Sequence, residues 1–285
     1  MTLVCAHAAF AVVAVPTGFA DELVVGGLSE PTAMAWLPDG RLLVAERVSA
    51  KIRLVVGGVL EPDPIFTVPE VEALQTEEGL LGLAVDPAFP DRPYVYLYFT
   101  HAGTQTSFLV MYTLTGDLTG GGPGLSVDPG SRYAILTDML NASFNHNGGG
   151  LHFGPDGRLY LGLGDDTFPC EIRVGNELAG ALLRLDVSAL PQPDAGPPDK
   201  SILVPADNPF VLSGDANVRL MAARGLRNPF SFHIDPLTGR VFIADVGLRD
   251  FEEINLLEAS NPGPDFGWPW YEGPAPLTIC INQFP

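Results

Sequence analysis

The sequence predicts an all-β protein, and more specifically a β-propeller. A turn of the Pro-Asp-Gly kind recurs along the chain, and a run of residues typical of a β-strand follows it directly each time. No stretch of eleven residues or more has the hydrophobic period of an amphipathic helix. Short sheets that repeat in this way hide their edges when they are arranged as blades around an axis.

The recurrent units share one turn chemistry. Pro presets φ, Asp hydrogen-bonds its own backbone and Gly accepts a positive φ, so the chain reverses and a strand follows. The units start near residues 38, 86, 154 and 235, which predicts about four blades. Their sequences are LPDGRLLVAE (37–46), DPAFPDRPYVYLYFT (86–100), GPDGRLYLGLGD (154–165) and DPLTGRVFIADVG (235–247).

More strands are expected between these units, together with one long loop. The loop is segment 188–201, which is rich in Pro and Asp. A β-sandwich or a barrel is the alternative architecture, and the repeated unit argues against it. The further strands expected are KIRLVV (51–56), FLVMYTL (108–114), RYAIL (132–136), ALLRLDV (181–187) and EEINLLE (252–258).

Size and charge limit the function classes. The chain has 285 residues, of which 46% are hydrophobic, so it can bury a substantial core. Its formal net charge of −19 argues against a nucleic-acid partner, because phosphate binding needs clustered Lys and Arg.

The N-terminal residues 1–16 resemble the apolar part of an export signal, although they lack its basic start. A buried strand is the alternative interpretation. Cys5 lies in this leader, and Cys170 and Cys280 are the remaining cysteines. These two either pair in an oxidising compartment or remain free thiols.

Three segments carry residues suited to chemistry. His146 precedes Gly148, Gly149 and Gly150, and an imidazole in a loop with little side-chain bulk is a candidate general base. A structural histidine is the plainer alternative. The three glycines would let a flat ligand approach the backbone.

The second segment is RGLRNPFSFHIDP. Pro229 biases Asn228 towards an extended backbone, and Arg227 presents a planar fork suited to a carboxylate, although a surface salt bridge is the alternative. The third is DVGLRDFEEIN (245–255), whose acids and turns suit Ca²⁺ only weakly, because the spacing is not that of an EF-hand.

Together these segments resemble a known family, the soluble quinoprotein sugar dehydrogenases of the glucose/sorbosone dehydrogenase type. The resemblance covers roughly residues 17–275, which would make 17–285 one propeller domain. It implies a six-bladed propeller that binds pyrroloquinoline quinone and Ca²⁺ and oxidises sugars by hydride transfer to the quinone. The motifs, in order, are EEGLLGLAVDPAF, NHNGGGLHFGPDGRLY, ALLRLDV, VPADNPF, GLRNPFSFHIDPLTGRVFIADVG, EEIN and FGWPWYEG.

The resemblance assigns a role to each matching residue. It makes His146 the catalytic base, and it places Asn145 where an Asp commonly supports that base. Arg227 and Asn228 match an Arg-Asn pair at the cofactor and the reacting centre, and Glu77 stands where glucose dehydrogenases carry a Gln near the cofactor.

The resemblance also implies calcium ligands. Gly247 and Leu248 match residues whose backbone carbonyls hold the calcium that polarises the quinone. Glu253 and Phe266 match positions that hold a second calcium in some members. The quinone carries three carboxylates, so a chain of charge −19 needs Arg227 and Ca²⁺ as local positive charge.

Three departures from the family pattern stand out. Asn145 in place of Asp would remove a charge that stabilises a protonated His146. Ala181 stands where many relatives have Lys. Four blades are recognisable where the family has six, and no Lys or Arg follows Gly273, so the chain is expected to be incomplete at its C-terminus.

The expected function is therefore oxidation of an aldose-type sugar in the periplasm or outside the cell, with an electron acceptor as partner. The alternatives are a non-catalytic propeller that binds a protein or a glycan, as in Hedgehog-interacting relatives, a propeller lactonase that binds Ca²⁺, or an inactive fragment. His146 and the Arg227-Asn228 pair favour the enzyme.

Overall fold

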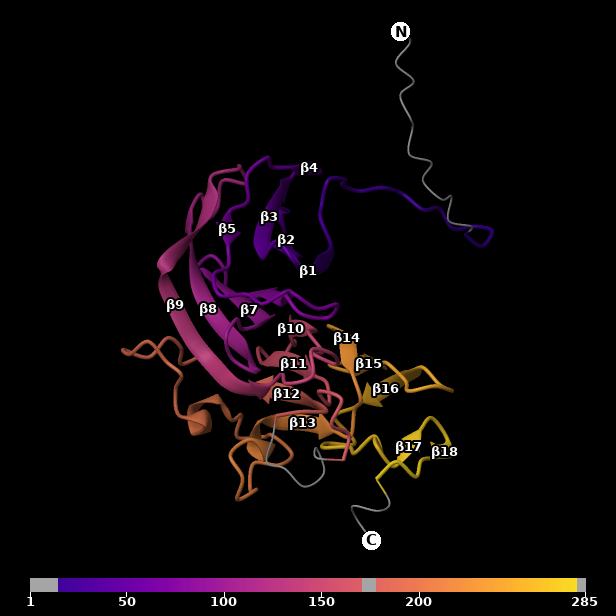
Figure 1. Ribbon diagram of the computed structural model, residues 1–285. Helices are drawn as coiled ribbons and strands as arrows, with labels where there is room; N and C mark the ends of the chain where they lie inside the picture. Colours follow the sequence, from indigo (N-terminus) through magenta and orange to yellow (C-terminus); the bar gives the residue numbers. More distant parts are fainter. Residues whose placement is uncertain (1–14, 171–177, 281–285) are drawn as a thin grey trace.

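The computed structural model describes residues 15–170 and 178–280, which form twisted antiparallel sheets arranged like the blades of a propeller (Figure 1). The all-β prediction is confirmed. Within these ranges the helical segments are two short 3-10 helices, η2 (Lys200–Leu203) and η3 (Val218–Leu220). The leader predicted at residues 1–16 lies almost entirely outside the described residues, as does Cys5.

Four sheets of three to five strands follow one another along the chain, and in each the neighbouring strands pair antiparallel. The first sheet contains β1 (Pro31–Trp36), β2 (Leu42–Glu46), β3 (Lys51–Val56), β4 (Val59–Leu60) and β5 (Phe66–Thr67). The second contains β6 (Leu80–Val85), β7 (Tyr94–Thr100), β8 (Thr106–Gly116) and β9 (Leu125–Leu140).

The third sheet contains β10 (Leu151–Phe153), β11 (Leu159–Leu163), β12 (Ala181–Leu185) and β13 (Met221–Arg224). The fourth contains β14 (Pro229–Ile234), β15 (Val241–Asp245) and β16 (Glu253–Leu257), and a small hairpin of β17 (Tyr271–Glu272) and β18 (Ala275–Pro276) follows it. All five additional strands predicted from the sequence are present, and segment 188–201 is irregular up to the start of η2.

The recurrent turn occupies the same place in every blade. Each of the four turns joins the first strand of a sheet to its second strand, so a blade begins one strand before its turn rather than at it. Gly40, Gly157 and Gly239 have φ angles of 87°, 72° and 70°. The positive φ predicted for the turn glycine is thus confirmed in three of the four units.

The core lies between consecutive sheets. One cluster of buried side chains fills the space between the first and second sheets, another between the second and third, and a third between the third and fourth. The second and third sheets therefore pack on both faces, and the first sheet packs its other face on a smaller cluster that includes Leu42 and Val44. This explains why strands such as β2, β6 and β11 are buried over almost their whole length.

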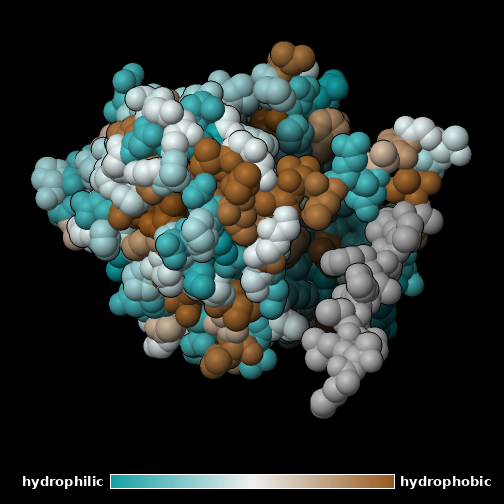
Figure 2. Space-filling model, turned by 90° about the horizontal axis from the view of Figure 1, so that it is seen from above, coloured by the Kyte–Doolittle hydropathy of each residue, from teal (hydrophilic) through white to brown (hydrophobic). Residues whose placement is uncertain are grey.

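Apolar side chains also remain exposed on the first and fourth sheets, and apolar patches interrupt the hydrophilic surface seen in Figure 2. Met34 and Trp36 are exposed on β1, and Phe242 and Ile254 on β15 and β16. Among the described helical segments, none has the length and hydropathy that a membrane span requires.

Cys170 and Cys280 form a disulfide, with 5.5 Å between their Cα atoms. The paired alternative is thus the one found in the structure. The bond closes a loop across 110 positions and ties the segment after β11 to the end of the described chain.

Candidate active site

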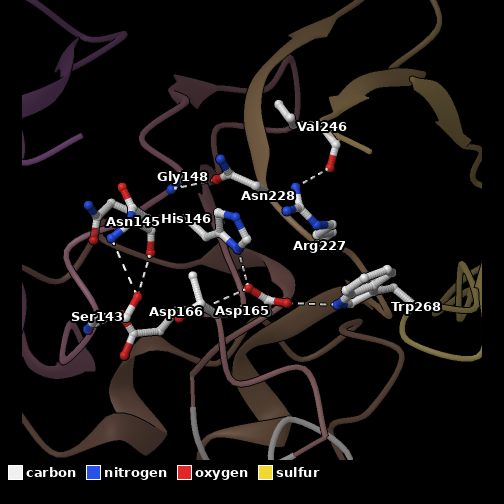
Figure 3. Close-up of polar contacts among 12 residues, drawn as sticks. Ser143, Asn145, His146, Gly148, Asp165, Asp166, Arg227, Asn228, Val246 and Trp268 are labelled. Carbon is white, nitrogen blue, oxygen red and sulfur yellow. Dashed lines mark hydrogen bonds and ion pairs between the residues drawn. The ribbon is translucent and has the colours of Figure 1, made fainter. Parts of the chain in front are cut away.

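Four segments meet at the blade ends opposite the recurrent turns (Figure 3). Two lead into the first strands of the third and fourth sheets, residues 141–150 and 225–228. Two follow the second strands of the same sheets, residues 164–167 and 246–248. The geometry of a propeller therefore brings together residues that are far apart in the sequence.

His146 is paired with a buried carboxylate. Its Nδ1 atom lies 2.5 Å from Oδ1 of Asp165, whose side chain is only 1% exposed. The backbone N–H of Thr167 donates to the same oxygen at 2.8 Å, and the indole N–H of Trp268 donates to Oδ2 at 2.8 Å. This arrangement leaves Nε2 of His146 as the basic nitrogen when Nδ1 carries the proton.

Asn145 does not have the place that the sequence suggested. Its hydrogen bonds are made by its backbone, which donates to and accepts from the hydroxyl of Ser143. The carboxylate beside His146 comes instead from Asp165, nineteen positions further along. Asn at position 145 therefore does not deprive the histidine of a charged partner.

The loop that carries His146, residues 141–150 and called the histidine loop below, is held by two other carboxylates. Glu77 accepts the backbone N–H of His146 at 2.7 Å, and Asp166 accepts those of Ala142 and Ser143 at 2.7 and 3.0 Å. His146 has a φ of 60°, a conformation that non-glycine residues seldom adopt, so the loop depends on these contacts. Burial raises the pKa of the Asp166 carboxyl above its ordinary value of 3.8, although the donated backbone hydrogen bonds oppose this shift.

The three glycines after His146 serve close packing, which the sequence analysis did not predict. A Cβ on Gly148 would lie 2.3 Å from the carbonyl oxygen of Gly162, and one on Gly150 would lie 2.8 Å from the ring of Phe232. Glycine is therefore required where this loop crosses β11 and β14.

Arg227 and Asn228 lie beside the histidine loop. The side-chain oxygen of Asn228 accepts the N–H of Gly148 at 3.1 Å, and the carbonyl of Arg227 accepts the N–H of Asp165 at 2.8 Å. Both N–H groups of the pair donate to the carboxylate of Asp245, whose pKa burial raises to about 6. The structure thus brings Arg227 and His146 together although 81 positions separate them.

The Arg227 side chain contacts two groups. One guanidinium nitrogen, Nη1, donates to the carbonyl of Val246 at 2.9 Å, and the guanidinium carbon lies 5.6 Å from the centre of the Trp268 ring. Its Nε is buried and makes no hydrogen bond to the described residues. A cation with spare donors of this kind suits an anionic ligand.

The turn after β15 carries the residues predicted to hold calcium. The N–H groups of Leu248, Arg249, Asp250 and Phe251 all donate to one oxygen of Glu272, a residue 3% exposed. A Cβ on Gly247 would lie 1.6 Å from the carbonyl oxygen of Phe251, so only glycine is compatible with this turn.

Glu253 and Phe266 have other partners in the structure. The carboxylate of Glu253 accepts the N–H of Gly273 and the side-chain amide of Asn255, and Phe266 donates its N–H to the carbonyl of Arg224. Among residues 15–170 and 178–280 no three His, Cys, Asp or Glu side chains gather as a metal site.

Sequence reasoning missed Asp165, Asp245, Glu272 and Trp268. Asp245 ends the second strand of its blade and Asp165 follows the second strand of its blade by two positions. The motifs GLGD and IADVG place an Asp there, so this position was available as a signal. Glu272 and Trp268 come from an irregular segment, and no local pattern indicates their contacts.

A cleft of about 560 Å³ lies beside the histidine loop. It is lined mainly by amides, carboxylates and a hydroxyl, with two apolar side chains at Leu74 and Phe144. The polar lining residues are Glu72, Gln75, Glu78, Thr104, Gln105 and Asn141.

The fold is that of a β-propeller, and the similarity to known proteins places it among the sugar dehydrogenases. The chain belongs to the glucose/sorbosone dehydrogenase family, whose model matches residues 28–275. The resemblance noted from the sequence motifs is thereby confirmed.

Two curated relatives and one solved structure illustrate the similarity. The chain is 27% identical to quinoprotein glucose dehydrogenase B of Acinetobacter calcoaceticus, over 88% of this chain and 52% of the relative. It is 26% identical to the aldose sugar dehydrogenase YliI of Escherichia coli, over 90% and 63% of the two chains.

The structure of aldose sugar dehydrogenase from Streptomyces coelicolor in its PQQ-bound form matches with a TM-score of 0.69 and 29% identity, over 88% of this chain and 66% of the other. The chain therefore spans between about half and two thirds of the length of these relatives.

Proposed function

We propose that this chain is the part of a quinoprotein that oxidises an aldose-type sugar, with His146 as general base and pyrroloquinoline quinone as cofactor. The observation that carries the proposal is the His146–Asp165 pair beside the Arg227–Asn228 pair. The family membership and the PQQ-bound state of the Streptomyces coelicolor relative support the same chemistry.

His146 performs the proton transfer in this proposal. With Nδ1–H donated to Asp165, Nε2 faces the substrate as an acceptor and takes the proton of the sugar hydroxyl. Asp165 then stabilises the imidazolium that forms, because the carboxylate lies 2.5 Å from Nδ1. Glu77 and Asp166 keep the imidazole in place by holding its loop.

Arg227 fits a cofactor that carries carboxylates. Its Nε is buried without a hydrogen-bond partner among the described residues, and Asp245 fixes the backbone that presents it. Arg227 and Asn228 would hold the quinone, and the backbone carbonyls of Gly247 and Leu248, in the turn whose N–H groups bind Glu272, would hold Ca²⁺. When bound, the quinone supplies the hydride acceptor and Ca²⁺ supplies a Lewis acid.

The cleft beside the histidine loop favours a neutral polyhydroxylated substrate. Amides, carboxylates and a hydroxyl on its wall supply hydrogen-bond partners for several hydroxyl groups, and Phe144 supplies an apolar surface.

We assign residues 17–285 to one domain, residues 1–16 to an export leader, and the location to the periplasm or the exterior. The disulfide between Cys170 and Cys280 suits such an oxidising compartment.

The test is reconstitution of the purified chain with pyrroloquinoline quinone and Ca²⁺, followed by aldose sugars and an artificial electron acceptor. The proposal expects saturable quinone binding, weakened by Arg227→Ala and unaffected by Arg240→Ala, a change to an exposed arginine on the opposite end of the fourth blade. Quinone binding without any sugar turnover would move the protein to the alternative class, a propeller that binds a ligand without catalysis.

A further inference from the structure

The indole of Trp268 joins the histidine–aspartate pair to the arginine of the site (Figure 3). We propose that Trp268 is a positioning residue that fixes the carboxylate of Asp165, and through it the tautomer of His146. This inference rests on the proposed role of His146 and adds a residue from a segment about one hundred positions away.

The first argument is the division of the Asp165 carboxylate between its partners. Oδ1 is hydrogen-bonded to Nδ1 of His146 and accepts the backbone N–H of Thr167. Oδ2 accepts the indole N–H of Trp268 at 2.8 Å in a buried contact. A buried carboxylate oxygen that loses its donor costs free energy of desolvation, so the group would turn to find another. The indole therefore prevents rotation that would take Oδ1 away from His146.

The second argument is the other use of the same ring. The face of the indole lies 5.6 Å from the guanidinium carbon of Arg227, within the range of a cation–π contact. Tryptophan combines an N–H donor at the ring edge with a large aromatic face, whereas Phe has the face without the donor. One side chain thus sets the relative position of the proton acceptor and the anion-binding residue.

The third argument is that Trp268 is itself fixed. It is 5% exposed, and its backbone N–H donates to the carbonyl of Gly225 at 3.0 Å. The backbone N–H of Phe266 donates to the carbonyl of Arg224. Segment 266–268 is therefore hydrogen-bonded to residues 224–225, just before Arg227. The disulfide at Cys280 further anchors this part of the chain to the segment that follows Asp165.

The test compares Trp268→Phe with Trp36→Phe, the same change at an exposed tryptophan of β1. The nitrogen-15 NMR spectrum of the imidazole reports the tautomer, with His146 assigned by its absence in His146→Ala. We expect one tautomer, protonated at Nδ1, in the wild type and in Trp36→Phe, and a mixture in Trp268→Phe. In the reconstituted protein Trp268→Phe should lower kcat about 10–100-fold, as is typical when the partner that orients a histidine is lost.

A double variant separates positioning from general damage. If Trp268 acts through Asp165, adding Trp268→Phe to Asp165→Asn should change the tautomer and kcat no further. Additive effects of the two changes, or an unchanged tautomer in Trp268→Phe, would overturn the proposal.

A second measurement needs no change at residue 268, so it holds even if Trp268→Phe folds poorly. The indole N–H resonance of Trp268 should differ between the wild type and Asp165→Asn, while that of Trp36 should be the same in both proteins. An unmoved resonance would contradict the contact. The NMR arms do not require turnover, so they stay informative if the proposed dehydrogenase activity is itself disproved.

Discussion

His146 Nδ1 and Asp165 Oδ1 lie 2.5 Å apart, although the two residues belong to different segments of the third blade. His146 precedes its first strand and Asp165 follows its second strand. The two segments meet because β10 and β11 are antiparallel, with Leu151 opposite Leu161. The hairpin of β10 and β11 therefore brings His146 and Asp165 together, and the effects predicted below for the base depend on this contact.

Asp165→Asn should retain the fold of the site but lower the rate of sugar oxidation. An amide at this position can present its NH₂ group to Nδ1 and favour the wrong tautomer, and it provides no charge for the imidazolium. We expect kcat to fall by at least about 10-fold. Asp91→Asn, at an exposed position between β6 and β7, is the control and should leave kcat unchanged.

Asp166→Asn should change the pH dependence of stability in a defined direction. Burial raises the folded-state pKa of Asp166 above 3.8, so the folded chain holds this proton more tightly than the unfolded chain does. The contribution of Asp166 to the free energy of unfolding therefore falls as the pH rises from 3.8 through the raised pKa.

Denaturant titrations of both proteins between pH 4 and pH 7 measure this effect, because the other carboxyl groups cancel in the comparison. The wild type should gain stability relative to Asp166→Asn as the pH is lowered. A wild type that loses stability relative to Asp166→Asn as the pH is lowered would contradict this prediction.

Gly148→Ala should destabilise the chain more than Gly157→Ala does. The two glycines have similar φ angles of 66° and 72°, so the backbone strain of an alanine is matched. Only at position 148 would the Cβ meet another atom, the Gly162 oxygen at 2.3 Å, whereas at position 157 nothing lies within 4 Å. We expect an additional loss of about 1–3 kcal/mol from overpacking, measured by urea unfolding, and equal losses would refute the packing role.

Removal of the disulfide should lower the melting temperature. The bond closes a loop across 110 positions, and a cross-link over such a loop typically contributes about 2–4 kcal/mol. Cys170→Ser combined with Cys280→Ser should therefore melt earlier than the wild type in calorimetry. A reductant should lower the melting temperature of the wild type only, and insensitivity of the wild type would mean that the cysteines are unpaired.

Local chemistry was sufficient to predict the blades. Pro, Asp and Gly at fixed positions define the turn by themselves, so segments near 38, 86, 154 and 235 revealed one hairpin for each sheet. The first strands were harder to recognise, because β10 has only three residues and β1 is half exposed. For this reason the blades were expected to begin at their turns.

The candidate site was only partly predictable. His146, Arg227 and Asn228 stand in conspicuous motifs, and the structure brings them together. Their supporting partners depend on contacts between distant segments, such as Trp268 with Asp165 across 103 positions. A sequence does not encode such pairings locally. The choice of Asp165 over position 145 is decided by the antiparallel register of β10 and β11.

The most direct test of the proposed function is the sugar-dependent reduction of an artificial electron acceptor by His146→Ala loaded with quinone and Ca²⁺. His233→Ala, a change at an exposed histidine of β14, is the matched control. We predict that His146→Ala binds the quinone as the wild type does but turns over about 10²–10⁴-fold more slowly, the usual cost of losing a general base. Turnover at the wild-type rate by His146→Ala would contradict the assignment of His146 as the base.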